Sequence, residues 1–294
     1  MAELAPLEAP GDFRLGFAGD TFNTAWYLRA LRDDVAVSYL SAVGDDDISH
    51  SMLDFMDKAG IGTTSIERIP GRSAGLYMIA IRNGERSFSY WRDTSAARQL
   101  ADDPGALARA LAGADQIYFS GITLAILSHA GQGRLLTALG EARSKGKTII
   151  FDPNLRPRLW DDQAQMTGTI MRGAAVSDMV LPSFEDEAEH FGDPDPAGTA
   201  RRYAQVGAGC VIVKNGEGAI HYLNDGATGT VAVTPASRVV DTTAAGDSFN
   251  AGILATTAKA MPLADRITFA SAVSKQVICG KGALVPLDKA ALQG

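Results

Sequence analysis

The 294-residue chain is 46% hydrophobic and 21% charged, and its 31 glycines and 12 prolines are spread along its length. This composition excludes a disordered protein and predicts one large α/β domain, or a large domain with a small appendage. The 27 basic and 34 acidic residues give a formal net charge of −7, which argues against a nucleic-acid binder that neutralises phosphates with a basic surface. The two cysteines, Cys210 and Cys279, lie in apolar segments without metal-binding or disulfide spacing.

The sequence contains no apolar run near the ~18 residues that a membrane helix needs. Its opening residues, MAELAPLEAPGDF, lack the basic start and apolar core of a signal peptide. We therefore expect a cytoplasmic protein without membrane contact.

The first hundred residues predict a small antiparallel sheet. Residues 13–18 form a short β-rich run, and residues 74–93 contain two β-rich runs joined by an Asn-Gly turn at residues 83–84, the strongest short signal for a hairpin. We expect about 12–18 and 72–93 to form a lid over one end of the main domain. Strand alternation places three hairpin side chains on one face. They are Phe88, Tyr90 and Arg92.

Apolar strand-like runs alternate with helical patterns through the chain. The runs lie at residues 35–44, 116–122, 147–154, 178–182 and 210–216. This alternation is typical of a parallel sheet covered by helices. Because these runs are apolar throughout, we expect both faces of the sheet to be buried.

The segment VVDTTAAGDSFNAGILATTAKA is the most informative stretch of the chain. It predicts a strand that ends at Val240, a tight turn of small residues, and a helix that begins near Ala244. The amides of Ala245, Gly246 and Asp247 would then be among the unpaired donors of the first helical turn, where phosphoryl groups bind. Asp247 would be placed to accept the proton of an attacking hydroxyl. The alternative interpretation is an acidic residue that only favours the helix start.

Part of this segment, DTTAAGD, resembles the DTxGAGD signature of the ribokinase-like (PfkB) sugar kinases. Four further segments match motifs of that family in order and spacing. They are AGDTFNTAWYLRAL, SGITLAIL, FDPNLRPRLW and VIVKNGEG. The similarity covers nearly the whole chain and is greatest to the 2-keto-3-deoxygluconate kinases. It implies a single α/β domain over residues 1–294 with a ribokinase-like three-layer fold: a mainly parallel sheet between helices, plus a small β-sheet lid.

The resemblance also implies an enzyme, a sugar kinase that uses ATP and Mg²⁺ to phosphorylate 2-keto-3-deoxygluconate at its terminal C6 hydroxyl. Asp247 would be the catalytic base, and the backbone of Ala244, Ala245 and Gly246 would form the anion hole. The implied substrate-binding residues are Gly19, Asp20, Asn23, Tyr77, Tyr90, Arg92, Arg156 and Asp247. The implied nucleotide-binding residues are Ser183, Lys214, Gly216, Gly218, Ala245 and Gly246.

Two arginines bear on the choice of sugar. A sugar acid carries a carboxylate, and a guanidinium group binds a carboxylate through two parallel hydrogen bonds. Arg156 follows the strand-like run that ends in FDPN, and Arg92 lies on the predicted hairpin. An ordinary surface ion pair is the alternative for each arginine taken alone.

Two glycines of the family pattern are replaced in this chain. The paired glycine near the start is Ala18-Gly19, and the first glycine of the GAGD signature is Ala244. Alanine narrows the dihedral angles that the second turn can adopt but keeps its N–H group. We expect both replacements to be tolerated.

The metal site is less clear from the sequence. The family's Asn-x-x-Glu motif, which helps to organise Mg²⁺ through water, has no clean match. The segment PSFEDEAEHFG offers Ser183 with Asp186, or Glu187 if the spacing slips by one residue. Helix capping by Ser183, with acidic residues in the first turn, is the alternative interpretation.

The start of the chain also departs from the family pattern. Family members open with a buried strand before the segment that resembles MAELAP, so the sheet here would lack roughly five or six residues of a strand. We hypothesise that Met1 is an internal methionine of a longer natural product and that the shorter form is destabilised.

Two other functions stay open from the sequence. One is a related kinase of fructose, ribose or a nucleoside, and the other is a non-catalytic sugar-binding regulator that keeps the fold. The exposed hairpin edges of the lid invite pairing with a second copy, so we also expect a homo-oligomer.

Overall fold

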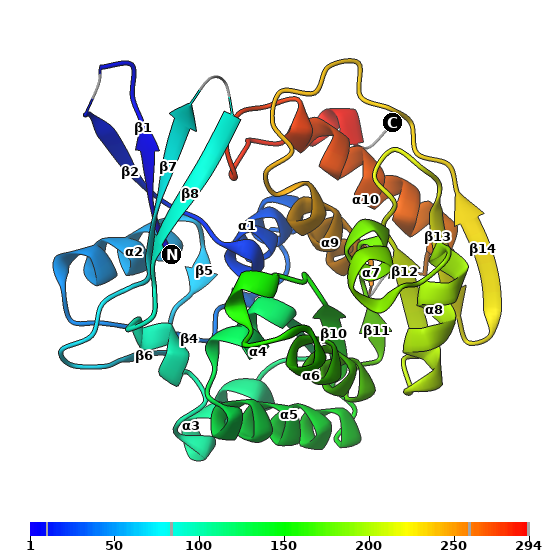
Figure 1. Cartoon of the computed structure of the whole chain (residues 1–294), viewed down its shortest axis with the longest axis horizontal. Helices are drawn as coiled ribbons and strands as arrows, with labels where there is room; N and C mark the ends of the chain where they lie inside the picture. Colours follow the sequence, from blue (N-terminus) through cyan, green and yellow to red (C-terminus); the bar gives the residue numbers. More distant parts are fainter. Residues whose placement is uncertain (10, 83–84, 258–259, 293–294) are drawn as a thin grey trace.

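The computed structural model describes residues 1–9, 11–82, 85–257 and 260–292, without the side chains of residues 81–86. Its largest sheet has the strand order β14-β13-β12-β11-β10-β9 (Figure 1). The strands are β9 (Gln116–Ser120), β10 (Thr148–Asp152), β11 (Met179–Val180), β12 (Cys210–Val213), β13 (Ile220–Asn224) and β14 (Ala227–Val231). The pairs from β9 to β12 are parallel, and β13 and β14 add antiparallel pairs at one edge. Four of the predicted apolar runs thus form the parallel part.

Helices cover both faces of this sheet. Alternate residues of each strand point to opposite faces, and both sets of apolar side chains are buried against helices. In β10, Ile149 and Phe151 belong to the buried cluster that contains Leu139 of α5. Ile150, between them, packs instead with Phe249 of α9. The predicted arrangement of a mainly parallel sheet between two helical layers is therefore present.

Helices lie between the strands, and within the described residues two more α-helices follow β14. The α-helices are α1 (Asp20–Leu31), α2 (Asp47–Lys58), α3 (Pro104–Ala112), α4 (Gly121–Ile126), α5 (His129–Ser144), α6 (Gln163–Ala175), α7 (Phe184–Phe191), α8 (Pro196–Gln205), α9 (Ala245–Thr256) and α10 (Leu263–Ile278). Helices α1, α9 and α10 lie together on one side of the sheet, while α5 and α6 lie on the other (Figure 1).

A second sheet of four strands stands beside the main one, in the order β2-β1-β7-β8 (Figure 1). Its strands are β1 (Ala2–Pro6), β2 (Phe13–Phe17), β7 (Leu76–Arg82) and β8 (Glu85–Trp91). The predicted hairpin and the predicted strand at 13–18 are confirmed, whereas β1 was not anticipated as their neighbour. The turn predicted at residues 83–84 lies outside the described residues.

Two local predictions are wrong. The run at 35–44 is interrupted, because it forms β3 (Val37–Ser38) and β4 (Ser41–Val43), which pair in parallel with β5 (Ile61–Gly62) and β6 (Ile66–Arg68) respectively. The predicted strand that ends at Val240 is also absent. Its backbone instead follows a loop, where the Val240 N–H donates to the carbonyl of Ile278 at the end of α10.

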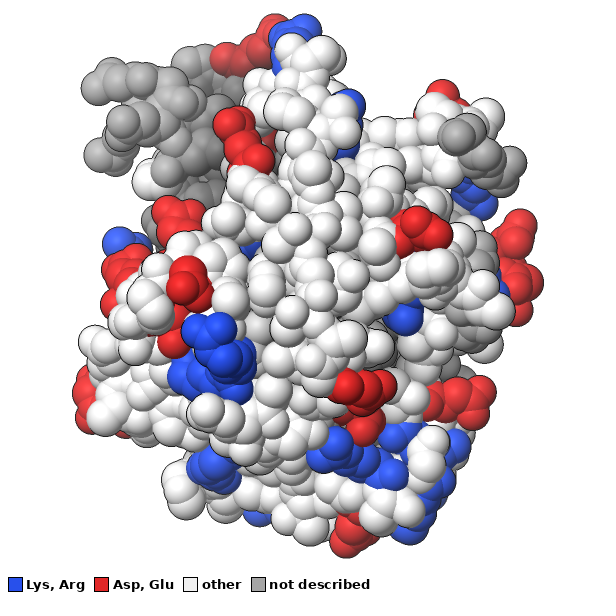
Figure 2. All heavy atoms as spheres, turned by 90° about the vertical axis from the view of Figure 1, so that its right-hand side faces the viewer, with Lys and Arg blue, Asp and Glu red and all other residues white. Residues whose placement is uncertain are grey.

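The surface carries charges of both signs. Figure 2 shows lysines and arginines interspersed with acidic residues and large uncharged areas on one face of the molecule. This agrees with the small negative net charge.

Within the described part of the chain, no helix has both the length and the apolar character of a membrane span.

Candidate active site

A cavity of about 480 Å³ opens where the carboxyl ends of the main sheet meet the four-stranded sheet. It brings together most of the side chains predicted from the sequence. From the first hundred residues these are Gly19, Asp20, Asn23, Tyr77, Tyr90 and Arg92. From the rest of the chain they are Arg156, Ser183, Asp186, Lys214, Ala244, Ala245, Gly246 and Asp247. Residues more than 220 positions apart thus share one cavity, as expected at the carboxyl edge of an α/β sheet.

Asp247 lies in the first turn of α9, whose capping residue Ala244 has a left-handed backbone with φ 60°. The amide of Asn23 donates a hydrogen bond of 2.7 Å to Asp247 Oδ2. Burial raises the pKa of Asp247 from 3.8 to about 7, and the negative charge of Asp20 acts in the same direction. A carboxylate with a pKa near the working pH is suited to act as a general base.

The predicted anion hole is only partly as expected. The Ala245 N–H donates to the carbonyl of Thr242, and the Ser248 N–H donates to the carbonyl of Ala244. Ala245 therefore contributes its amide to the turn itself, and the prediction of an unpaired donor there is wrong. The amides of Gly246 and Asp247 remain the candidates for contact with an anion.

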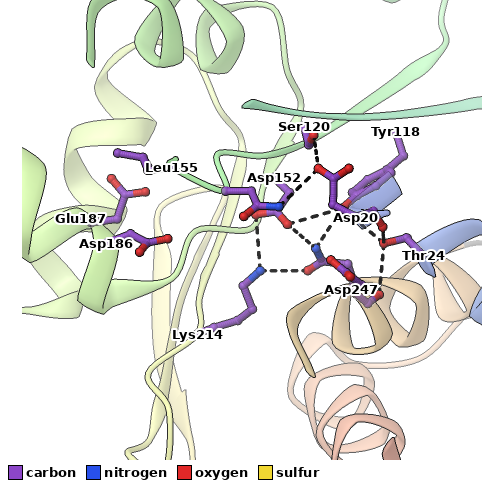
Figure 3. A network of polar contacts seen from close by, with 12 residues as sticks. Asp20, Thr24, Tyr118, Ser120, Asp152, Leu155, Asp186, Glu187, Lys214 and Asp247 are labelled. Atoms are coloured by element: carbon purple, nitrogen blue, oxygen red, sulfur yellow. Dashed lines mark hydrogen bonds and ion pairs between the residues drawn. The ribbon is translucent and has the colours of Figure 1, made fainter. Parts of the chain in front are cut away.

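Asp20 begins α1 directly after Gly19, whose φ of 151° is a conformation that favours glycine. The hydroxyl of Ser120 donates to Asp20 Oδ2 at 2.5 Å, and the amide of Asn154 donates to the same oxygen at 3.3 Å. Burial raises the pKa of Asp20. These contacts fix the orientation of the carboxylate at the cavity wall (Figure 3).

The four-stranded sheet supplies an aromatic wall. Tyr77 and Tyr90 are directly opposite each other on β7 and β8, with ring centroids 6.0 Å apart. The guanidinium of Arg92 lies 4.3 Å from the centroid of the Tyr90 ring, and the Tyr77 hydroxyl donates to the carboxylate of Glu3. The predicted shared face is therefore confirmed, and it faces the cavity.

Arg156 extends the positive charge at the cavity. Its side chain is 52% exposed, and its guanidinium lies 3.8 Å from Asp186. The charges of Arg156 and Arg92 act on each other and on Asp20. Two guanidinium groups thus line the same cavity as the carboxylate of Asp20.

Three polar side chains join the site from the ends of β10 and β12 and from α9; Asp152 and Asn250 are buried, and Lys214 is 12% exposed. Lys214 Nζ donates to Asp152 Oδ1 at 3.4 Å and to Asn250 Oδ1 at 3.2 Å. The Asn250 amide in turn donates to Asp152 Oδ2 at 2.7 Å and to the Tyr118 hydroxyl at 3.0 Å. Figure 3 shows Lys214 between Asp186 and Asp247.

Comparisons with known proteins identify the family. The model of the pfkB family carbohydrate kinases matches residues 3–290. The chain belongs to this family. The 2-dehydro-3-deoxygluconokinase of Dickeya dadantii is 36% identical over 98% of this chain and 95% of its own, and that of Escherichia coli is 35% identical with the same coverage. The crystal structure of a PfkB protein from Polaromonas sp. has a TM-score of 0.85 at 25% identity and covers 100% of this chain and 96% of its own. The ribokinase-like fold predicted from the sequence is confirmed.

Of the two candidate metal ligands of this pfkB kinase, Asp186 lines the cavity and Glu187 does not. Glu187 is fully buried and accepts a hydrogen bond of 2.7 Å from Arg202 and bonds of 2.9 Å from the Tyr203 hydroxyl. The prediction of Glu187 as a metal ligand is wrong, because its carboxylate lies away from the cavity and is hydrogen-bonded to Arg202 and Tyr203 of α8. Ser183 lies in the cavity and occupies the N-cap position of α7, with acidic residues in the first turn as the capping interpretation expects, but its side chain makes no cap hydrogen bond.

Gly216 and Gly218 follow β12 but are not among the residues that line the cavity. Gly216 has a φ of 53°, which fits a turn that needs glycine. Their contact with a nucleotide stays a prediction.

The sequence interpretation missed Asp152, Asn250 and Tyr118. One signal was available for Asp152, since it ends a buried strand in FDPN, at the sheet edge where ligands bind. Asn250 lies three residues after Asp247, and this spacing places both on one face of a helix.

Proposed function

We propose that the protein transfers the γ-phosphoryl group of ATP to the C6 hydroxyl of 2-keto-3-deoxygluconate, also called 2-dehydro-3-deoxygluconate. The observation that carries the proposal is the carboxylate of Asp247, which lies at the start of α9 in the same cavity as Arg92 and Arg156. The similarity to two 2-dehydro-3-deoxygluconokinases supports the choice of substrate.

The proposed reaction begins when Asp247 accepts the proton of the C6 hydroxyl. The hydroxyl oxygen then forms a bond to the γ-phosphorus while the bond to the β,γ-bridging oxygen breaks and ADP leaves. Positioning and charge stabilisation supply most of the catalysis in such transfers. The positive end of the α9 dipole and the amides of Gly246 and Asp247 would stabilise the charge on the phosphoryl group.

The described residues contain no group of three or more His, Cys, Asp or Glu side chains arranged to hold a metal ion. This fits Mg²⁺, which usually enters kinase sites with substrate phosphates and water and with only one or two protein carboxylates. Asp186 is the carboxylate that would face the ion, and when bound Mg²⁺ neutralises phosphate charge. Ser183 and Lys214 border the same part of the cavity. Because ATP is supplied in the cytoplasm, we expect the enzyme there.

The arginines favour a sugar acid over a neutral sugar. Burial lowers the pKa of Arg92, which means that its charge is partly desolvated and gains more from an anionic partner. Arg156 donates to the Leu155 carbonyl at 2.6 Å, and its ion pair with Asp186 is long, at 3.8 Å. Fructose, ribose and nucleosides carry no carboxylate for these groups, and a non-catalytic regulator would have no use for a base of raised pKa.

A coupled assay of ADP release tests the proposal. We expect turnover with 2-keto-3-deoxygluconate that exceeds turnover with fructose, ribose and adenosine by at least 100-fold in kcat/KM. Arg156→Ala should raise KM for the sugar acid about 10- to 100-fold, as for a lost charged hydrogen bond, and leave KM for ATP unchanged. Equal turnover of fructose, or sugar binding without ADP release, would contradict the proposal.

We further propose that the four-stranded sheet is the lid of the cavity and pairs with a second copy of the chain. The face away from Tyr77 carries three exposed apolar side chains, Phe13, Leu15 and Trp91. Exposed apolar patches of this kind mark interaction surfaces. Light scattering of the wild type and of Leu15→Glu tests this, and a wild type that is monomeric at 50 μM would contradict it.

A further inference from the structure

We propose that Lys214 is a catalytic residue that neutralises charge on the migrating phosphoryl group, and that Asp152 and Asn250 are positioning residues that hold its ammonium in place. This inference rests on the proposed phosphoryl transfer. It identifies Lys214 as the side chain whose positive charge stabilises the transferred group.

The first observation is the position of the ammonium. A methyl group placed on Gly246 would lie 3.6 Å from Lys214 Nζ. The lysine charge therefore lies directly against the turn that begins α9. The same positive charge lowers the pKa of the Asp247 carboxylate. A phosphoryl group at this turn would meet the helix terminus and the ammonium together.

The second observation is the fixed geometry of the side chain. Its backbone is held at the end of β12, because the Lys214 N–H donates to the Pro182 carbonyl at 2.9 Å and its own carbonyl accepts from Phe184 at 2.8 Å. Its ammonium donates to Asp152 and Asn250. The side chain of Lys214 is only 12% exposed and that of Asp152 only 5%, so water does little to screen the pair.

The third observation is that the hydrogen bonds found within the described residues leave part of the ammonium available. An ammonium has three donors, and the two hydrogen bonds to Asp152 and Asn250 use two of them. These bonds are 3.4 and 3.2 Å long, longer than the usual 2.7–2.9 Å of strong charged pairs. Asp152 and Asn250 thus hold the ammonium in place without using all of its hydrogen-bond donors.

Asn250 is the part of this arrangement that couples it to the base. It is completely buried, and it lies one helical turn after Asp247 on α9. Its carbonyl oxygen accepts from Lys214 and its amide donates to Asp152, so it bridges the two ions. Any change in the position of α9 would move Asp247 and the anchor of Lys214 together.

In the transfer step, the C6 oxygen forms its bond to phosphorus as the bond to the ADP oxygen breaks, and the hydroxyl proton passes to Asp247. Lys214 takes no part in this proton transfer. Its role is to offset the negative charge that the phosphoryl oxygens and the leaving oxygen carry in the transition state.

The test compares the full chain with Lys214→Met, Lys214→Arg, Asn250→Ala and the double variant Lys214→Met/Asn250→Ala. Lys147→Met is the matched control, since Lys147 also pairs with an aspartate, Asp115, at 3.9 Å but lies outside the cavity. Wild-type turnover is measured first with the sugar acid and with fructose. Lack of turnover with both would refute the proposed function; the role of Lys214 is judged only from the ratio of variant to wild type.

We expect Lys214→Met to lower kcat by about 100- to 1000-fold, the effect of losing one preorganised charge-stabilising donor, with KM for the sugar within threefold. In this variant, the loss of kcat/KM at acid pH should begin at a higher pH than in the wild type, because the cation no longer lowers the pKa of Asp247. Lys214→Arg should recover at least tenfold, and Lys147→Met should match the wild type.

Asn250→Ala should lower kcat about tenfold or more, and the double variant should be no slower than Lys214→Met alone, because positioning matters only while the cation is present. A kcat for Lys214→Met within threefold of the wild type, or an unmoved acid limb, would refute the catalytic role. Multiplicative losses in the double variant would refute the positioning role of Asn250.

Discussion

The amide of Asn23 donates its hydrogen bond to the carboxylate of Asp247 across 224 positions of the chain, at 2.7 Å. The side-chain oxygen of Asn23 also accepts from the Gly19 N–H at 3.1 Å. Asn23 therefore has a fixed orientation and stabilises the charged form of Asp247. Its contribution lowers the pKa of Asp247, in opposition to burial.

We predict that Asn23→Ala raises the pKa of Asp247 further. Loss of one charged hydrogen bond corresponds to about one pH unit, so the acid limb of kcat/KM should move up by about that amount. The pH profile of the variant, measured between pH 5 and 9, checks this. A limb at the wild-type position, in a protein that melts normally, would show that Asn23 does not tune the base.

The wild-type enzyme should itself lose activity below neutral pH. The base must be deprotonated to accept the hydroxyl proton, and its pKa is raised to about 7. Below that pH, kcat/KM should fall about tenfold per unit. Asp247→Asn should abolish nearly all turnover at every pH while it keeps sugar affinity, as measured by calorimetry. A flat profile down to pH 5 would contradict the assignment of Asp247 as the base.

Asp247→Asn should also stabilise the fold at pH 8. The folded pKa of about 7 lies above the ordinary 3.8, so between these values the folded state holds a proton that the unfolded chain has released. Stability from this group therefore falls as pH rises from about 4 to 7 and is constant above. The free energy of unfolding of Asp247→Asn at pH 8 should therefore exceed that of the wild type. The upper bound of this difference is about 4 kcal/mol, and we expect about 1–3 kcal/mol after solvent screening.

Thermal melts of the wild type and Asp247→Asn at pH 4, 6 and 8 measure this effect. The gap in Tm between them should be small at pH 4 and grow toward pH 8. A gap that is constant with pH would mean that the charge of Asp247 is not the cause.

Ala244→Gly should stabilise the protein. Ala244 has a φ of 60°, and a left-handed conformation costs an L-residue about 1–2 kcal/mol. Glycine removes that strain but adds about 0.4–1 kcal/mol of unfolded-state entropy, which leaves a net gain of about 0.5–1 kcal/mol. Ala245→Gly is the control, since it lies in the helix and should be destabilising. If denaturant unfolding shows a lower free energy of unfolding for Ala244→Gly than for the wild type, the backbone of Ala244 is not strained.

The parallel sheet and the hairpin could be predicted because their signals are local. Apolar runs such as 147–154 and 210–216 each form one strand, and burial of both faces favours a continuous apolar sequence. The strand predicted up to Val240 did not form, because that backbone finds its partner at Ile278. Hydrogen bonding to a distant helix end leaves no periodic signal in the sequence.

The site residues that belong to a sequence motif could be predicted. Those brought together only by the topology of the fold could not. Asp247 follows from the motif of small residues around it. The contacts among Asp152, Lys214 and Asn250 depend on β10, β12 and α9 meeting at one sheet edge. Glu187 was misassigned because its partner Arg202 lies in the next helix, and spacing within α7 gave no indication of that ion pair.

The pairing of α1 with α9, in which the Thr24 hydroxyl donates to the Asp247 carbonyl at 3.2 Å, has a consequence for biosynthesis. A nascent chain cannot assemble this contact until residue 247 has left the ribosome. Asp247 therefore cannot occupy its place beside Asn23 during most of translation, and this part of the cavity is completed only when α9 docks against α1.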